Sequence, residues 1–133
     1  MNEWRTDILV VGGGAGGIAA AMIATSLDQR VVVTEESDWV GVQLTAQLVP
    51  PDEGLWVETT GTTARYRRYR DGVRQYYRDH YPLTDEARGT RLLNPGECVI
   101  TPLAHEPRVG VAVLGQMTAW AESSGRLTVL RGY

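Results

Sequence analysis

The sequence predicts an α/β fold: a parallel βαβ unit, then a mainly helical and irregular insert, then a final strand. An apolar run, Ile8 to Val11, is followed at once by a segment with glycine at five of six positions. An Ala-rich stretch from Ile18 to Leu27 has no helix breaker, and a second β-branched run, Arg30 to Thr34, ends at Glu35. Strand, glycine turn, helix and strand in this order form a Rossmann-like unit, whose crossover should be right-handed.

Each element of this unit has its own signal. Ile8 to Val11 is apolar without alternation, which is typical of a strand covered on both faces in a parallel sheet. Ile18 to Leu27 is apolar around its circumference, so we expect a buried helix. Residues 30–34 are rich in valine, which favours a strand.

The middle of the chain predicts one long helix between irregular segments. Residues 37–60 contain glycine and proline and show no sustained periodicity, so they should be mostly loop. From Thr62 to His80, tyrosine and valine recur at helical spacing with arginine at the other positions, and Pro82 ends the pattern. Residues 83–101 are irregular, with a turn at Asn94-Pro95-Gly96.

The C-terminal part predicts a helix and a strand. Pro107 suits a helix start, an apolar stripe follows it, and Gly125 suits the stop. Leu127 to Leu130 is a final strand. We therefore predict a single domain over 1–133, with the βαβ core at 1–45, the insert at 46–106, and a helix and strand at 107–133 that return to the sheet.

Composition excludes several classes of protein. The chain has 133 residues, of which 43% are hydrophobic and 22% charged, which excludes a disordered or collagen-like chain. Cys98 is the single cysteine, so neither a disulfide framework nor a multi-cysteine zinc site is expected, and we predict no bound metal. No run of 18 apolar residues is present. We expect a cytoplasmic protein that does not bind membranes.

The glycine segment carries the main functional signal. In Gly12-x-Gly14-x-x-Gly17, the first glycine permits the tight turn, the second lets the backbone approach a pyrophosphate, and the third lets the helix pack closely on the strand. The helix N-terminus then presents unpaired N–H groups to the phosphates. Glu35, at the end of the second strand, can accept hydrogen bonds from a ribose and would repel a 2′-phosphate. The pattern indicates FAD or NAD rather than NADP, against the alternative of a glycine-rich turn with no ligand.

The stretch from Asp7 to Gln43 resembles the N-terminus of FAD-dependent oxidoreductases of the glutathione-reductase-like clan. The resemblance continues through QLVPPDE, the Arg/Tyr segment, LNPGE and HEPRVGVAVL, and so covers nearly the whole chain. It implies that FAD is the cofactor. One departure is Val42, where the paired-glycine motif of these proteins leads us to expect glycine.

The fingerprint and the resemblance together give the predicted cofactor-binding residues. The glycines would hold the FAD pyrophosphate, Glu35 the adenosine ribose, and the segment after residue 40 would run past the dinucleotide. The set is Gly12, Gly13, Gly14, Ala15, Gly16, Gly17, Glu35, Glu36, Gly41 and Gln43. No catalytic residue can be assigned.

The resemblance also implies an activity and raises the question of completeness. The activity would be hydride transfer between an unknown small-molecule substrate and the flavin. Flavoproteins of this clan are several hundred residues long and carry further Rossmann strands and a late Gly-Asp motif, so we expect an incomplete FAD/NAD(P)-binding domain, inactive by itself. The alternatives are a complete small protein, a non-catalytic nucleotide-binding module, and an NAD-binding subunit.

The arginine–tyrosine helix could suggest nucleic acid, but Asp71 and Asp79 interrupt its charge and its tyrosines follow a helical stripe that favours burial. We therefore expect no nucleic-acid partner, and leave open a homo-oligomer or a complementing chain. His80 should close the long helix. His105 could cap the next helix or lie near the flavin, and Cys98 is expected to be a small buried residue.

Overall fold

The two β-branched runs pair side by side, as predicted. β1 (Ile8–Val11) lies parallel to β2 (Val31–Glu35), and β3 (Leu127–Arg131) lies parallel to β2 on its other side. The computed structural model describes residues 3–51 and 53–133. Its sheet has the order β1-β2-β3, which is the order of the first half of a Rossmann sheet.

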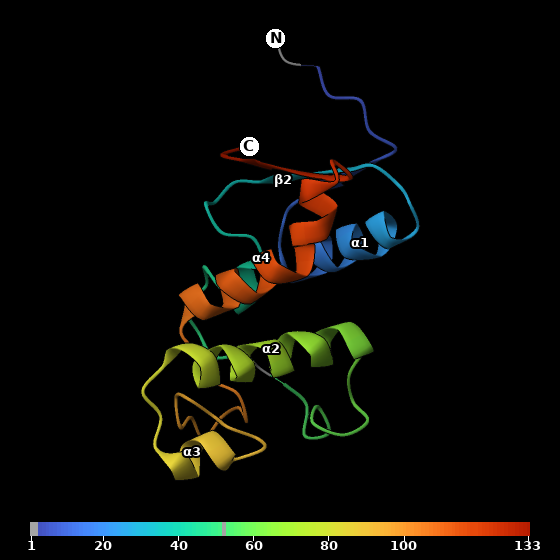
Figure 1. The fold of residues 1–133 in the computed structure, drawn as a ribbon. Coiled ribbons are helices and arrows are strands. Elements are labelled where there is room, and N and C mark those ends of the chain that lie inside the picture. The colour runs from blue at the N-terminus through green and yellow to red at the C-terminus, as the bar shows by residue number, and fades with distance from the viewer. Residues whose placement is uncertain (1–2, 52) are drawn as a thin grey trace.

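Two helices cover one face of the sheet. α1 (Ala15–Ser26) connects β1 to β2, and α4 (Pro107–Ser123) leads into β3. Figure 1 shows both helices on the same side of the sheet, as expected when two right-handed crossovers follow one another in the same direction. The α/β fold class is therefore confirmed.

The insert adds a further layer. α2 (Ala64–His80) packs across α4, and α3 (Asp85–Gly89) and the long loops lie on the far side of α2 (Figure 1). A 3₁₀ turn, η1 (Val42–Leu44), follows the second strand. The prediction did not include α3 or η1, because elements of three to five residues are too short to show a period.

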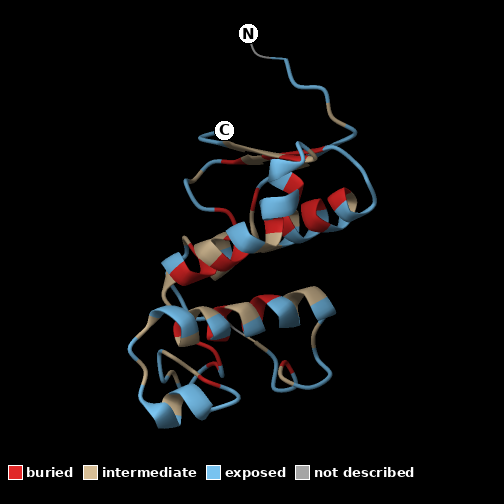
Figure 2. Ribbon diagram, viewed as in Figure 1, coloured by how far each residue is buried: buried red, intermediate tan, exposed pale blue. Residues whose placement is uncertain are grey.

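The core follows the predicted stripes. Tyr69, Val73 and Tyr77 of α2 are buried against α4, so the tyrosine stripe is a packing surface as expected. Figure 2 shows the buried residues concentrated between the sheet and its helices and between α4 and α2. We expected the first helix to begin at Ile18, but α1 begins at Ala15. The glycines in its first turn allow the helix to start close to the strand.

The prediction that β1 is covered on both faces is wrong. Leu9 and Val11 are 58% and 81% exposed, whereas Val10 packs into the core. The physical reason is the layout of the helices: α1 and α4 cover one face, and among the described residues no element covers the other. β1 is also an edge strand in this sheet.

Among the described residues, no helix combines the length and the apolar composition needed to cross a lipid bilayer.

Candidate functional site

The turn between β1 and α1 depends on two glycines. Gly12 has φ +95°, a left-handed conformation that side chains rarely adopt. At Gly17, a Cβ would lie 2.0 Å from the Gly12 carbonyl oxygen, a distance that no real side chain tolerates. Gly17 therefore lets α1 start directly beneath the turn, and the fingerprint spacing has the structural role that the sequence assigned to it.

Within the described residues, no side chain caps the N-terminus of α1. Gly14 is its N-cap and contributes no side-chain hydrogen bond. By contrast, the hydroxyl groups of Thr63 and Thr84 accept hydrogen bonds from backbone N–H groups at the starts of α2 and α3. The first N–H groups of a helix need an acceptor, and among the described residues no side chain serves this purpose at α1, nor at α4. An anionic group fits there, aided by the helix dipole.

Glu35 lies against the glycine turn, at the end of β2. A Cβ at Gly13 would lie 2.9 Å from Glu35 Oε2. Ser37 donates two hydrogen bonds to Glu35 Oε1, at 2.9 Å from its backbone nitrogen and 2.7 Å from its hydroxyl. Burial acts to raise the pKa of Glu35, but the hydrogen bonds from Ser37 and the Gly13 amide outweigh it, so the pKa lies below its ordinary value. The carboxylate is thus ionised and fixed in direction, and it can accept further hydrogen bonds.

The segment after β2 returns to the same turn. Gly41 donates a backbone hydrogen bond of 2.7 Å to the Gly13 carbonyl and forms a bridge with Gly14. Its φ is +94°, and a Cβ there would lie 2.4 Å from a methyl carbon of Leu114, so glycine is required for two reasons. The glycine turn, the carboxylate and this second glycine segment therefore meet in space.

Val42 stands where a glycine was expected. It has φ +27°, which is unusual for a β-branched residue. Its side chain lies 4.0 Å from the position that a Cβ of Gly14 would take. The backbone thus adopts the conformation that favours glycine while carrying a valine beside the turn.

A cavity of about 370 Å³ adjoins the start of α1. It is lined by Ala15, Gln43, Leu44, Gln47, Val49, Pro50 and Pro51. Of the predicted residues, Ala15 and Gln43 therefore border this cavity, whereas Glu36 is exposed beside Glu35. The structure brings together most of the predicted residues, although they come from three separate stretches of the sequence.

The sequence analysis missed a buried ionic network in the insert. Arg70 and Arg74 of α2 are each 1% exposed, although we expected arginine stems at the edges of the stripe. Arg70 pairs with Glu53 and Glu58, and Arg74 also pairs with Glu58. Because 70 and 74 are spaced by four and share a face with Tyr77, this spacing could have indicated that they are buried.

The network ties both long loops of the insert to α2. Glu53 accepts hydrogen bonds from the hydroxyl groups of Tyr66 and Thr101, the latter at 2.9 Å. Arg74 Nε donates to the Leu93 carbonyl at 3.0 Å. The loop that precedes α2 in the sequence and the loop that follows it are therefore both attached to this helix.

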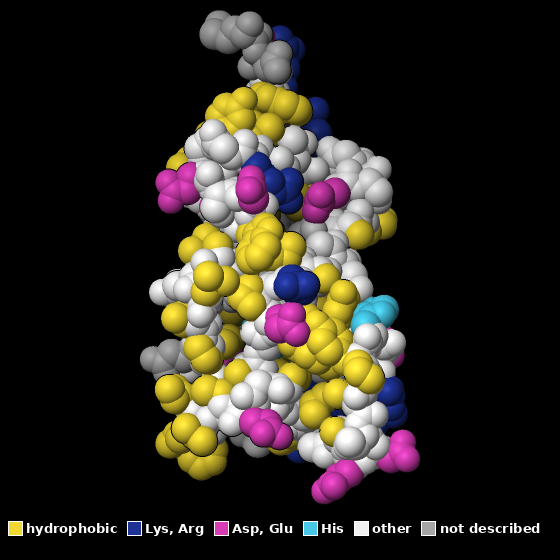
Figure 3. All heavy atoms as spheres, turned by 90° about the vertical axis from the view of Figure 1, so that its left-hand side faces the viewer, with side chains coloured by type: hydrophobic (Ala, Val, Ile, Leu, Met, Phe, Trp, Pro, Cys, Tyr) yellow, Lys and Arg dark blue, Asp and Glu magenta, His cyan; other side chains and the backbone are white. Residues whose placement is uncertain are grey.

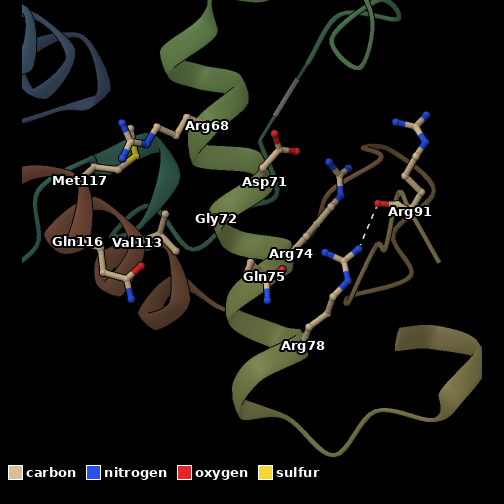
Figure 4. Close-up of a pocket in the computed structure, with 10 residues that line it drawn as sticks. All are labelled: Arg68, Asp71, Gly72, Arg74, Gln75, Arg78, Arg91, Val113, Gln116 and Met117. Atoms are coloured by element: carbon tan, nitrogen blue, oxygen red, sulfur yellow. Dashed lines mark hydrogen bonds between the residues drawn. The ribbon is translucent and has the colours of Figure 1, made fainter. Parts of the chain in front are cut away.

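The remaining basic side chains do not converge on one binding point. A cavity of about 480 Å³ beside α2 is lined by four arginines, including Arg68, Arg78 and Arg91. Figure 4 shows Arg68 beside Met117, whereas Arg78 and Arg91 lie on the opposite side of α2 in that view. The Arg78 guanidinium donates hydrogen bonds to the carbonyl oxygens of Thr90 and Arg91. On the face shown in Figure 3, basic side chains are scattered rather than gathered in a patch.

His80 ends α2, as predicted. His105 does not cap α4, because Glu106 is the N-cap; instead His105 Nε2 lies 2.7 Å from the Tyr69 hydroxyl.

Cys98 is half-buried and forms no disulfide. Among the described residues, no three histidine, cysteine or acidic side chains come together as a metal site.

The comparisons with known proteins identify a family. A family model described as FAD dependent oxidoreductase matches residues 7–132, which is nearly the whole chain. A search of curated proteins found no match.

Proposed function

The chain belongs to the FAD-dependent oxidoreductase family, whose cofactor is FAD, and we propose that it forms the part of a flavin oxidoreductase that holds the dinucleotide. The turn from Gly12 to Gly17 would bind the pyrophosphate, and Glu35 the adenosine ribose. The open N-terminus of α1, facing a site walled by glycine backbone, is the observation that carries this proposal.

The residues present fit FAD in charge and in space. A pyrophosphate needs N–H donors and close backbone approach, which the uncapped α1 and the glycines supply. A ribose hydroxyl needs an acceptor, which the ionised Glu35 supplies. The cavity beside Ala15 and Gln43 continues from the phosphate end and has room for the next part of the cofactor.

The same carboxylate gives the site its selectivity. Glu35 is buried and held by Ser37, so it cannot turn away from a ligand that carries a negative charge on the ribose. A 2′-phosphate there would meet uncompensated repulsion. The site therefore favours FAD over NADP.

The proposed reaction is hydride transfer between a small-molecule substrate and the cofactor. When bound, the flavin supplies the hydride-accepting centre. This chain's own contribution is to bind and orient the cofactor by way of the glycine turn and Glu35. We also propose a cytoplasmic location, supported by the single cysteine. We propose no nucleic-acid partner, supported by Asp71 and Asp79 within α2 and by the scattered basic side chains on the face shown in Figure 3.

A second candidate function is a nucleotide-binding module without catalysis. The observation in its favour is Val42, because its side chain beside Gly14 narrows the space through which a pyrophosphate would approach. In that case FAD would bind weakly or not at all.

A titration of the purified chain with FAD tests the proposal. We expect saturable binding, seen in the flavin absorbance at about 450 nm and in quenched flavin fluorescence. Glu35→Ala should weaken binding by about tenfold, the loss of one charged hydrogen bond. Glu86→Ala, an exposed acid in α3 and outside the predicted cofactor-binding residues, is the control and should bind like the wild type. A chain that takes up no FAD would refute the proposal and favour the non-catalytic module.

A further inference from the structure

We propose that Tyr69, His105 and Gly110 form a clamp on the Leu44 carbonyl, hereafter the Leu44 clamp, which fixes the turn after Gly41 in the shape that receives the cofactor. Tyr69 and His105 would then be positioning residues. The part of the proposal that concerns FAD rests on the proposed function, whereas the part that concerns the turn does not.

The geometry of the clamp is visible at Gly110. A Cβ built there would lie 2.7 Å from the Leu44 carbonyl oxygen, 2.8 Å from the Tyr69 hydroxyl and 3.0 Å from His105 Nε2. Three polar atoms from three parts of the chain thus surround one point. The absence of a side chain at residue 110 leaves the space in which they can approach one another.

The chemistry of the three groups limits the direction of their hydrogen bonds. Tyr69 Oη and His105 Nε2 are 2.7 Å apart, so one donates to the other. The Leu44 carbonyl can only accept. Burial lowers the pKa of His105, and the Leu44 carbonyl is among the groups that oppose this shift, so the carbonyl lies within hydrogen-bonding reach of the His105 ring.

The other nitrogen of His105 bears on the tautomer of the ring. Nδ1 is buried and has no hydrogen-bond partner among the described residues. Leaving a lone pair unsatisfied is more common in folded proteins than leaving a buried N–H without an acceptor. The tautomer protonated on Nε2 would leave a lone pair on Nδ1, rather than an N–H group, without a partner.

Leu44 is directly coupled to the glycine turn. Its backbone N–H donates to the Gly41 carbonyl at 2.9 Å, and the Gly41 N–H donates to the Gly13 carbonyl at 2.7 Å. A shift of Leu44 would be transmitted along this chain of hydrogen bonds. Tyr69 belongs to α2 and His105 precedes α4, so the clamp attaches the insert to the segment that the cofactor would contact.

Burial argues for positioning rather than catalysis. Tyr69 is 2% exposed, and its hydroxyl lies 2.7 Å from His105 Nε2. The buried Tyr69 side chain is therefore placed to hold the turn rather than to contact a substrate. The clamp therefore acts on a cofactor only through Leu44 and Gly41.

Three pairs of variants test the clamp. Tyr69→Phe and His105→Asn remove its hydrogen bond, and their controls Tyr76→Phe and His80→Asn alter residues of the same types that make no side-chain hydrogen bond within the described part of the chain. Gly110→Ala places a methyl group among the three atoms. Its control is Gly115→Ala, where a Cβ meets no heavy atom within 4 Å.

Two measurements are made on each variant: the dissociation constant for FAD, and hydrogen–deuterium exchange of the amides of Leu44, Thr45 and Gln47, which hydrogen-bond within the turn. We expect the clamp variants to weaken FAD binding and to accelerate exchange, each by about fivefold to tenfold, the net value of one hydrogen bond. The controls should change neither by more than about twofold.

Hydrogen–deuterium exchange at these amides tests whether the clamp exists, even in the absence of FAD. If Tyr69→Phe and His105→Asn exchange like the wild type, the clamp is refuted. If exchange rises but FAD affinity is unchanged, the clamp exists and its role in cofactor binding is refuted. If the wild type binds no FAD, the proposed function fails and exchange alone decides the clamp. Should His105→Asn not fold, Tyr69→Phe, which removes one oxygen atom, decides by itself.

Discussion

The βαβ unit and the insert are held together by different interactions. In the βαβ unit, parallel backbone pairing and apolar side chains such as Ile18, Val31 and Val33 form the core, and glycines allow close approach. In the insert, long loops are attached to α2 by two buried arginines and the carboxylates of Glu53 and Glu58. The comparison teaches that a glycine turn can be built from local sequence, whereas its support depends on contacts between distant residues.

The largest effect should come from breaking the ionic network. Arg70→Met leaves two carboxylates without their shared partner, which should lower the free energy of unfolding by about 3–5 kcal/mol. Hydrogen exchange should rise in the insert first, before it rises in the βαβ unit. The control is Arg68→Met, an exposed arginine on the same helix, for which a change within about 0.5 kcal/mol is expected. Equal stability of Arg70→Met and wild type in urea would show that the network does not hold the insert.

The next effect concerns the βαβ unit. Gly17→Ala places a methyl carbon 2.0 Å from the Gly12 carbonyl oxygen, so the turn must move, at a cost of about 3 kcal/mol. FAD binding should be lost with it. Gly16→Ala meets no heavy atom within 4 Å and should stabilise the chain by up to about 1 kcal/mol. Thermal unfolding of the two variants distinguishes them; similar melting temperatures would contradict the close packing of α1.

A smaller effect on the free energy of unfolding should appear at low pH. Burial acts to raise the pKa of Glu58, but the hydrogen bonds and charges of Arg74 and Arg70 outweigh it, and the pKa lies below its ordinary value. The folded state then binds the Glu58 proton more weakly than the unfolded state. The stabilisation is present above the ordinary glutamate pKa of about 4.3 and is lost as pH falls through the lower folded-state value.

Urea unfolding between pH 7 and pH 3 measures this loss. About 2 kcal/mol should be attributable to Glu58, the order of magnitude for hydrogen bonds to a charged group. Glu58→Gln should be less stable than the wild type at neutral pH, and its free energy of unfolding should change less between pH 7 and pH 3. If the variant and the wild type lose stability in parallel, Glu58 is not the group responsible.

The smallest effect concerns Val42, where one substitution should change both the stability of the chain and its affinity for FAD. Val42→Gly should relieve the positive φ and stabilise the chain by about 1 kcal/mol. It should also tighten FAD binding, because the side chain beside Gly14 is removed. Val99→Gly, at a nearly fully exposed position without positive φ, is the control and should destabilise slightly. Weaker FAD binding by Val42→Gly would mean that the valine contacts the cofactor favourably.

The sequence was sufficient to predict the βαβ unit, because its signals are local. The strand at Ile8–Val11 lies where predicted, and the glycine spacing predicted the tight turn and the close approach of α1. The family resemblance, rather than a local signal, led us to expect glycine in place of Val42, which has φ +27°.

The rest could not be predicted, because its causes lie far apart in the chain. The burial of Arg70 depends on Glu53 and Glu58, which lie in a segment with no period. The contact of His105 with Tyr69 requires that α2 and the start of α4 be placed together. The exposure of Leu9 follows from the layout of both helices, which no single segment reveals.

The register of the sheet also sets an order of folding. Val31 pairs with Ile8 on one side and with Leu127 on the other, and the entire insert lies between β2 and β3. The entropy of loop closure grows with the length of the intervening chain, and distant pairings slow folding. During refolding, the pairing of β1 with β2 should therefore precede the arrival of β3. The glycine turn that we propose to bind the pyrophosphate would then form early, and a nucleotide bound there would act as a template around which the slower half of the chain assembles.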